Sequence, residues 1–188
     1  MKTLQDYAST ILVDEPVRVK RSPELNAKFT KMANEIYRCP VRNRNKRDYT
    51  NVMHSVEKAV VEHALAQLTG MQLNPAEFNY KDRNTYAWDV VDSEESKTFE
   101  CKRWADRWLS FHPENLATFT KNTDIVDYLV SGKVFKTSEY FTVAFHLVAN
   151  AKNFEKYVRP SQYDNKCYYD HNRAAVNGDA MFKNHVYF

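Results

Sequence analysis

Apolar residues recur at two different spacings along the chain, and each spacing predicts a different kind of element. In residues 24–37 they recur every three or four positions, which predicts an amphipathic helix after Pro23. The same spacing predicts a longer helix over residues 51–68, which Asn51 caps and Gly70 ends. Shorter helices are predicted over residues 4–12 and 124–130. Helices are therefore expected to dominate the first third of the chain.

Two short runs rich in β-branched and aromatic residues, 86–92 and 97–104, flank the polar segment 93–96. This pattern predicts a β-hairpin with a four-residue loop. The loop length also fixes which residues face each other across the two strands, and it places Asp89 opposite Glu100. The hairpin is therefore expected to bring two carboxylates together.

The most apolar stretch of the chain, residues 140–149, is rich in aromatic and β-branched types and predicts a central strand buried on both faces. A further strand is predicted at residues 78–80. The strand at 140–149 follows a predicted helix, an order that is typical of a mixed sheet. The predicted fold class is therefore α/β, with a mixed central sheet flanked by helices.

Successive side chains of a strand point to opposite faces, so Asp89, Glu100 and Lys102 are expected to share one face of the hairpin. The other face is expected to carry Trp88, Val90, Phe99 and Cys101. Opposed carboxylates destabilise a sheet unless a cation lies between them, since their Cβ atoms are only about 4.5 to 5.5 Å apart. Carboxylate oxygens are ligands that Mg²⁺ prefers, so the pattern predicts a Mg²⁺ site. Lys102 would then orient a water or stabilise charge on a phosphate.

The predicted helix over residues 51–68 offers a further acidic group. Glu57 falls within its apolar stripe, where a carboxylate needs a partner because burying a bare charge is costly. Glu62 is expected on the opposite side of the helix, paired with Lys58 in solvent. Glu57 is therefore expected to have a partner within the fold, and a position at the edge of the stripe is the alternative.

The order Asp89, ten intervening residues, then Glu100-Cys101-Lys102 resembles the signature of the PD-(D/E)XK nuclease superfamily, an Asp followed by an acidic residue, any residue and Lys on adjacent strands. Trp88 stands where many members have Pro. The resemblance implies a restriction-endonuclease-like core and a nuclease that uses Mg²⁺, with Mn²⁺ as the alternative ion. It also implies that Asp89, Glu100 and Lys102 are catalytic. The metal ligands it implies are Glu57, Asp89 and Glu100.

Composition excludes several other classes of protein. The 188 residues are 43% hydrophobic and 14% aromatic, which favours one globular domain. With only three glycines there is no Gly-rich phosphate loop, so no nucleotide cofactor is expected. The three cysteines are widely separated and lack zinc-site spacing, which indicates a reducing cytoplasm. No apolar run reaches the length of a membrane span or a signal peptide, so no membrane partner is expected.

Positive charge is concentrated near the start of the chain. Residues 17–47 contain ten Lys and Arg and two Glu, although the net charge of the whole chain is only +3. Such a block suits a phosphate backbone, and a solvated helix face is the alternative. The candidate nucleic-acid-binding residues, there and further along the chain, are Arg42, Arg44, Lys46, Arg47, Arg103, Arg107, Lys166 and Arg173.

The chain is interpreted as a single nuclease-like domain with a basic N-terminal helical arm (1–50), a catalytic core (51–149) and an aromatic, basic C-terminal extension (150–188). The predicted function is that of a Mg²⁺-dependent DNA endonuclease. A homodimer is expected if both strands of a duplex are cut. A non-catalytic nucleic-acid-binding or regulatory protein that uses the basic arm stays open, as does an RNA nuclease on the same scaffold.

Overall fold

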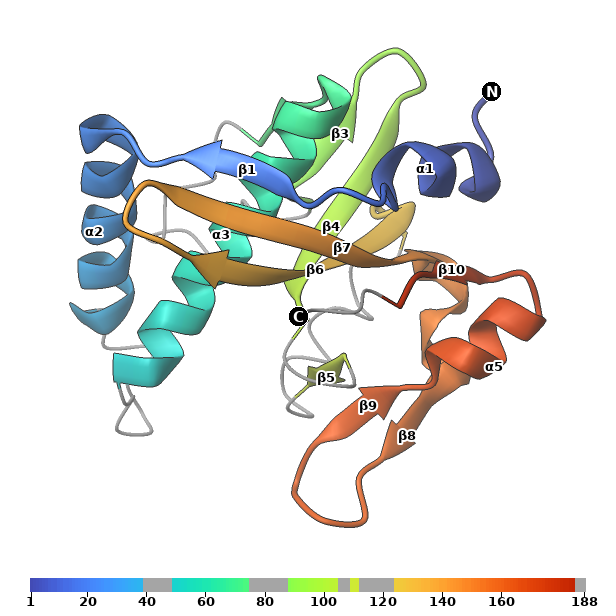
Figure 1. Cartoon of the computed structure of the whole chain (residues 1–188). Helices are drawn as coiled ribbons and strands as arrows, with labels where there is room; N and C mark the ends of the chain where they lie inside the picture. Colours follow the sequence, from blue (N-terminus) through green and yellow to red (C-terminus); the bar gives the residue numbers. More distant parts are fainter. Residues whose placement is uncertain (39–48, 75–87, 105–108, 112–123, 185–188) are drawn as a thin grey trace.

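The computed structural model describes residues 1–38, 49–74, 88–104, 109–111 and 124–184 (Figure 1). The helices are α1 (Leu4–Ile11), α2 (Pro23–Arg38), α3 (Tyr49–Thr69), the 3-10 helix η1 (Ala151–Tyr157) and α5 (His171–Val176). The strands are β1 (Val17–Lys20), β2 (Gln72–Leu73), β3 (Val90–Asp92), β4 (Lys97–Arg103), β5 (Ser110–Phe111), β6 (Tyr128–Lys136), β7 (Tyr140–Asn150), β8 (Val158–Pro160), β9 (Cys167–Tyr169) and β10 (Ala180–Phe182). In these ranges, no helix combines the length and the apolar character that crossing a bilayer requires.

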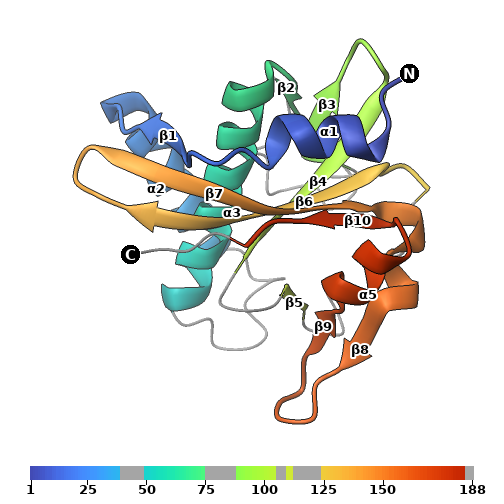
Figure 2. The same ribbon diagram turned by 45° about the vertical axis from the view of Figure 1, so that its right-hand side comes forward.

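Seven strands form one mixed, strongly curled sheet (Figure 2). Its order is β1-β7-β6-β4-β3-β2, and β10 also pairs with β7. β4 and β6 run parallel, whereas the other pairings of this sheet are antiparallel. The predicted α/β class with a mixed sheet is therefore confirmed. The sheet draws on all three predicted segments of the chain, because β1 and β10 lie outside residues 51–149.

The predicted hairpin is present in the predicted register. β3 pairs with β4 so that Val90 faces Phe99 and Asp92 faces Lys97. Residues 93–96 form the turn, in which Ser96 has a positive φ of 54°. The hairpin forms because four polar residues separate two runs of strand-forming residues. The predicted strand at 78–80 lies outside the described residues.

The most apolar stretch forms the predicted central strand, β7, but the predicted helix over residues 124–130 is wrong. Residues 128–136 instead form β6, which pairs with β4 on one side and β7 on the other. Gly132 lies within this strand, where an added Cβ would be 2.8 Å from Val143 Cγ1, so the close approach of β7 requires glycine. Pairing with two neighbouring strands outweighs the weak helical spacing of this run.

The two long predicted helices are confirmed as α2 and α3, and the short predicted helix at the start of the chain is confirmed as α1. α3 begins at Tyr49, so Asn51 lies inside the helix and does not cap it. Gly70 follows α3 with φ of 74°, a left-handed conformation that glycine adopts without strain. α1 packs against the hairpin, with Tyr7 edge-on to Phe99 at a ring-centroid distance of 5.0 Å.

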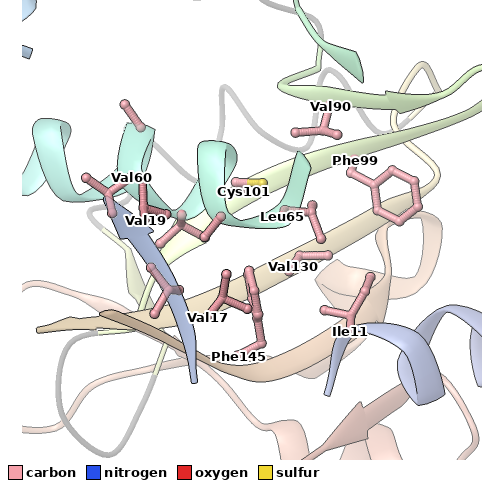
Figure 3. Packing of buried hydrophobic residues seen from close by; sticks show 14 of the residues in the cluster. Ile11, Val17, Val19, Val60, Leu65, Val90, Phe99, Cys101, Val130 and Phe145 are labelled. Atoms are coloured by element: carbon pink, nitrogen blue, oxygen red, sulfur yellow. The ribbon is translucent and has the colours of Figure 1, made fainter. Parts of the chain in front are cut away.

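Two hydrophobic clusters lie on opposite sides of the main sheet. The first packs α1 and α3 against the sheet, including its strand β1, and Figure 3 shows side chains from these elements meeting there. The second lies among β5, η1, β9 and α5. Residues that alternate along β6 divide between the two clusters, with Val130 in the first and Leu129 in the second. In Figure 2, α1 accordingly lies on the opposite side of the sheet from α5 and the β8–β9 pair.

The apolar face of the hairpin is predicted correctly except at one residue. Val90, Phe99 and Cys101 belong to the first cluster, whereas Trp88 packs against the second cluster. Trp88 precedes β3, so the strict alternation of a strand does not apply to it. The different position of Trp88 does not affect the register in which β3 and β4 pair.

Candidate functional site

The hairpin fixes the orientation of the Asp89 carboxylate. Asp89 lies directly before β3, and its backbone N–H donates to the carbonyl of Phe99 at 2.8 Å, which continues the ladder by one residue. Its Oδ2 accepts the backbone N–H of Cys101 at 2.6 Å. Both the backbone and the side chain of Asp89 therefore form hydrogen bonds with β4. The side-chain bond holds the carboxylate against this strand.

The structure brings Asp89, Glu100 and Lys102 together, as the sequence predicts. The carboxyl groups of Asp89 and Glu100 both contact the ammonium of Lys58 on α3, which lies 2.8 Å from Asp89 Oδ1 and 3.4 Å from Glu100 Oε1. The Lys102 ammonium donates to Glu100 Oε1. Two carboxyl groups and a lysine therefore meet where the hairpin packs against α3. Their proposed roles as metal ligands and catalytic groups stay predictions.

Lys58, predicted to lie in solvent, occupies the centre of this cluster. Its Nζ lies 2.8 Å from Asp89 Oδ1, 3.3 Å from Glu62 Oε1 and 3.4 Å from Glu100 Oε1. The ammonium donates a hydrogen bond to Asp89 and forms ion pairs with Glu62 and Glu100. One cation thus links α3 to both strands of the hairpin.

The predicted positions of the two acidic residues of α3 are wrong, because the buried residue is Glu62 and the more exposed one is Glu57. Glu62, predicted to face solvent, has a side chain only 6% exposed and joins the cluster through Lys58. Glu57, predicted to join the cluster, is 30% exposed and pairs with Arg103 at 3.3 Å. The spacing of Lys58 and Glu62 does predict their ion pair, but not its burial. α3 is buried over a wider arc than one stripe, as shown by Val56, Ala59, Val60 and Val61.

Burial and close charges set the protonation states of the cluster. Burial raises the pKa of Asp89 well above its ordinary value, and the charges of Glu100 and Glu62 raise it further. Burial would also raise the pKa of Glu100, but the Lys102 and Lys58 ammonium groups outweigh it and lower that pKa to about 2. Burial would lower the pKa of Lys58, yet the surrounding carboxylates raise it well above its ordinary value. Glu100 is therefore ionised and Lys58 protonated at neutral pH.

The carboxylate oxygens around Lys58 are hard ligands of the kind that bind Mg²⁺. Within the described ranges, no group of three or more His, Cys, Asp or Glu side chains is itself arranged to hold a metal ion. The Lys58 ammonium instead stands in for such an ion, because it contacts three carboxylates at one point. Three carboxylates suit a divalent cation by their chemistry, but Lys58 would have to leave this point and the oxygens would have to move closer together for an ion to bind.

Three of the predicted nucleic-acid-binding residues are described, namely Arg103, Lys166 and Arg173. Arg173 is exposed on α5. Burial lowers the pKa of His54 on α3, and the positive charges of Arg103 and Lys166 lower it further. Arg103 lies beside α3, where it pairs with Glu57, and Lys166 pairs with Asp164 at 3.5 Å. The remaining predicted residues, Arg42, Arg44, Lys46, Arg47 and Arg107, lie outside the described part of the chain.

Comparison with known proteins does not assign the chain to a family. The chain matches no protein-family model, and no curated protein matches it. The resemblance to the PD-(D/E)XK superfamily therefore depends on the residues and contacts described above.

Proposed function

We propose that the protein is a Mg²⁺-dependent endonuclease that hydrolyses phosphodiester bonds in DNA on a core of the PD-(D/E)XK kind. The observation that supports the proposal most strongly is the convergence of Asp89, Glu100 and Lys102 at the junction of the hairpin and α3, where Lys58 contacts both acids. A mixed sheet packed with helices agrees with such a core. The alternation of acid, apolar residue and lysine in β4 is what places both charged groups on one face.

Asp89, Glu100 and Glu62 are the residues that would hold the metal ion, and Mn²⁺ shares the charge and ligand preference of Mg²⁺. When bound, the ion would lower the pKa of a water, polarise the scissile phosphate and stabilise the leaving oxygen. Glu62 replaces Glu57 in this proposed set, because Glu57 pairs with Arg103. The bond from the Cys101 N–H keeps the Asp89 carboxylate in place before any ligand arrives.

Lys102 has a separate role in this proposal. Its ammonium is held by Glu100, so a positive charge lies directly beside the proposed ligands. An ammonium in this position orients the attacking water and offsets the negative charge that develops on the phosphate. Arg103, the next residue, lies beside the same part of α3 and supplies a cation for the DNA backbone.

A cleavage assay with plasmid DNA and with single-stranded DNA tests this function. Purified protein is incubated with each substrate in Mg²⁺, in Mn²⁺ and in EDTA. Nicked or linear plasmid that forms with the metal ion and not with EDTA supports the proposal, because phosphodiester hydrolysis at this site requires the ion. The ratio of linear to nicked product also reports whether one strand or both are cut.

Single-residue variants assign the activity to the site. Asp89→Asn and Glu100→Gln keep the shape of each side chain, and each is expected to abolish cleavage while DNA binding is retained. Glu94→Gln is the matched control, because Glu94 is an exposed acid in the turn of the same hairpin. Circular dichroism of each variant checks folding. Cleavage that persists in a folded Asp89 or Glu100 variant would contradict the proposed site.

A non-catalytic nucleic-acid-binding protein is the second candidate. The position of Lys58 favours it, because an ammonium already neutralises the carboxylates without a metal ion. Binding of DNA without nicking in any divalent ion would support this candidate. Cleavage of RNA with no cleavage of DNA would assign the same site to an RNA nuclease.

A further inference from the structure

We propose that Lys58 is an internal cation that competes with a divalent metal ion for the carboxylates of Asp89, Glu62 and Glu100. The inference rests on the proposed function, which supplies the metal ion, but it concerns what the chain does when that ion is missing. Lys58 would hold the three carboxylates together in the metal-free protein and leave them when the ion binds.

Lys58 contacts all three carboxylates, through a hydrogen bond to Asp89 and ion pairs with Glu62 and Glu100. Its Nζ lies within 3.4 Å of one oxygen from each of three carboxylates, and an ammonium has three protons to donate. Two of the carboxylates come from the hairpin and one comes from α3 itself, one helical turn after Lys58. The ammonium therefore takes the point at which all three carboxylates could share a single ion.

A divalent ion and an ammonium exclude each other from this point. Two cations a few ångströms apart in a buried site repel strongly, since screening by water is weak there. The Lys58 side chain has a route away from the cluster, because it is 32% exposed and carries its charge on a flexible four-carbon stem. Binding of the ion thus requires that this side chain turns toward solvent and that the three carboxylate oxygens, which lie 2.8 to 3.4 Å from the ammonium, move in to the roughly 2.0–2.1 Å of a Mg²⁺ ligand.

Replacement of Lys58 by an uncharged residue of similar length tests the competition. Lys58→Met is expected to bind Mg²⁺ and Mn²⁺ about tenfold or more tightly than the wild type, because no ammonium has to leave first. The metal-free variant is expected to melt at a lower temperature, and Mg²⁺ should raise its Tm more than that of the wild type. Isothermal titration calorimetry and thermal denaturation measure the two effects.

Lys97→Met is the matched control. Lys97 lies on β4, and its ammonium pairs with the single carboxylate of Asp127 at 2.8 Å. Loss of that pair should leave metal affinity unchanged. A folded Lys58→Met protein that binds both ions no more tightly than the wild type would overturn the proposal.

A second measurement uses the wild-type protein and so does not depend on how Lys58→Met folds. Lysine residues are acetylated with a limiting reagent, and mass spectrometry measures modification at Lys58 and Lys97 with and without Mn²⁺. Modification of Lys58 is expected to rise several-fold at saturating Mn²⁺, while that of Lys97 stays constant. Reactivity of Lys58 that is unchanged or lowered by the ion would contradict displacement.

The two proposals fail in different ways. If plasmid is not cleaved but Lys58→Met binds the ion more tightly than the wild type, the nuclease function fails and the competition stands. If cleavage requires Asp89 and Glu100 but neither ion affinity nor Lys58 reactivity changes as expected, the nuclease function stands and the competition fails.

Discussion

Tyr7 and Asp92 are 85 positions apart in the chain, and the Tyr7 hydroxyl donates a 3.0 Å hydrogen bond to the Asp92 carboxylate. The same carboxylate accepts from Lys2 Nζ at 2.8 Å, and its other oxygen accepts the backbone N–H groups of Glu94 and Glu95. Asp92 is buried at the end of β3, so these donors replace the water that the carboxylate loses. The contact fastens α1 to the hairpin that carries the candidate site.

We expect this contact to make stability depend on pH. Burial acts to raise the pKa of Asp92, but the hydrogen bonds from Lys2 and Tyr7 lower it below its ordinary value. The stabilisation by Asp92 is therefore complete above about pH 4 and is lost as pH falls through the folded-state pKa. Asp92→Asn should reduce the free energy of unfolding by about 1–3 kcal/mol at neutral pH. Urea denaturation at several pH values measures this difference, which should shrink below about pH 4. A difference that is constant with pH would contradict the assignment.

Glu62 and Glu57 provide a direct comparison on one helix. Glu62→Gln is expected to lower Mg²⁺-dependent cleavage about 10- to 100-fold, because it removes a charged oxygen donor from the carboxylate cluster. Glu57→Gln loses only a partly exposed pair with Arg103 and should change cleavage much less. Initial rates at saturating DNA, measured over a range of Mg²⁺ concentrations, distinguish the two. Equal effects of the two substitutions would remove Glu62 from the proposed site.

Gly132 is expected to tolerate no side chain. A Cβ there would lie 2.8 Å from Val143 Cγ1 and 3.3 Å from the carbonyl oxygen of Ala144, so the fully buried Val143 side chain would have to shift within the core. Gly132→Ala should destabilise the protein by about 1–3 kcal/mol in urea denaturation. Ser138→Ala, in the exposed turn between the same strands, is the control and should change stability by less than about 0.5 kcal/mol.

Phe99 is expected to dominate the packing between α1 and the hairpin. It is fully buried, with Tyr7 edge-on at 5.0 Å and Tyr128 stacked at 5.4 Å. Phe99→Ala leaves a cavity and should cost about 3–5 kcal/mol of unfolding free energy. Tyr163→Ala removes an aromatic ring that is 97% exposed and should have little effect. Chemical denaturation compares the two, and a small loss for Phe99→Ala would mean that the hairpin is not anchored through this ring.

The hairpin could be predicted from the sequence because its determinants are local. A polar turn of fixed length sets the register, and alternation then places Asp89, Glu100 and Lys102 together. The run at residues 124–130 could not be assigned in the same way. Its apolar residues suit a helix or a strand, and only its pairing with β4 and β7 decides between them.

The part of the site that lies on α3 depends on how the helix is rotated against the sheet. The sequence predicts the Lys58 and Glu62 ion pair from their spacing, but spacing alone does not show that both face the hairpin. Consecutive burial of Val60 and Val61 shows that α3 is covered on more than one side. A run of adjacent apolar residues is therefore the signal in the sequence that could have indicated a buried position for Glu62.

The pairing of β1 with β7 has a consequence for synthesis of the chain. Val17 pairs with Val143, so β1 emerges from the ribosome long before the strand that completes its hydrogen bonds. Contacts between such distant residues form slowly because a long loop must close first. We therefore expect β1 to join the sheet only after translation has passed β7, and a nascent fragment that stops short of Tyr140 to lack the strand with which the backbone of residues 17–20 pairs.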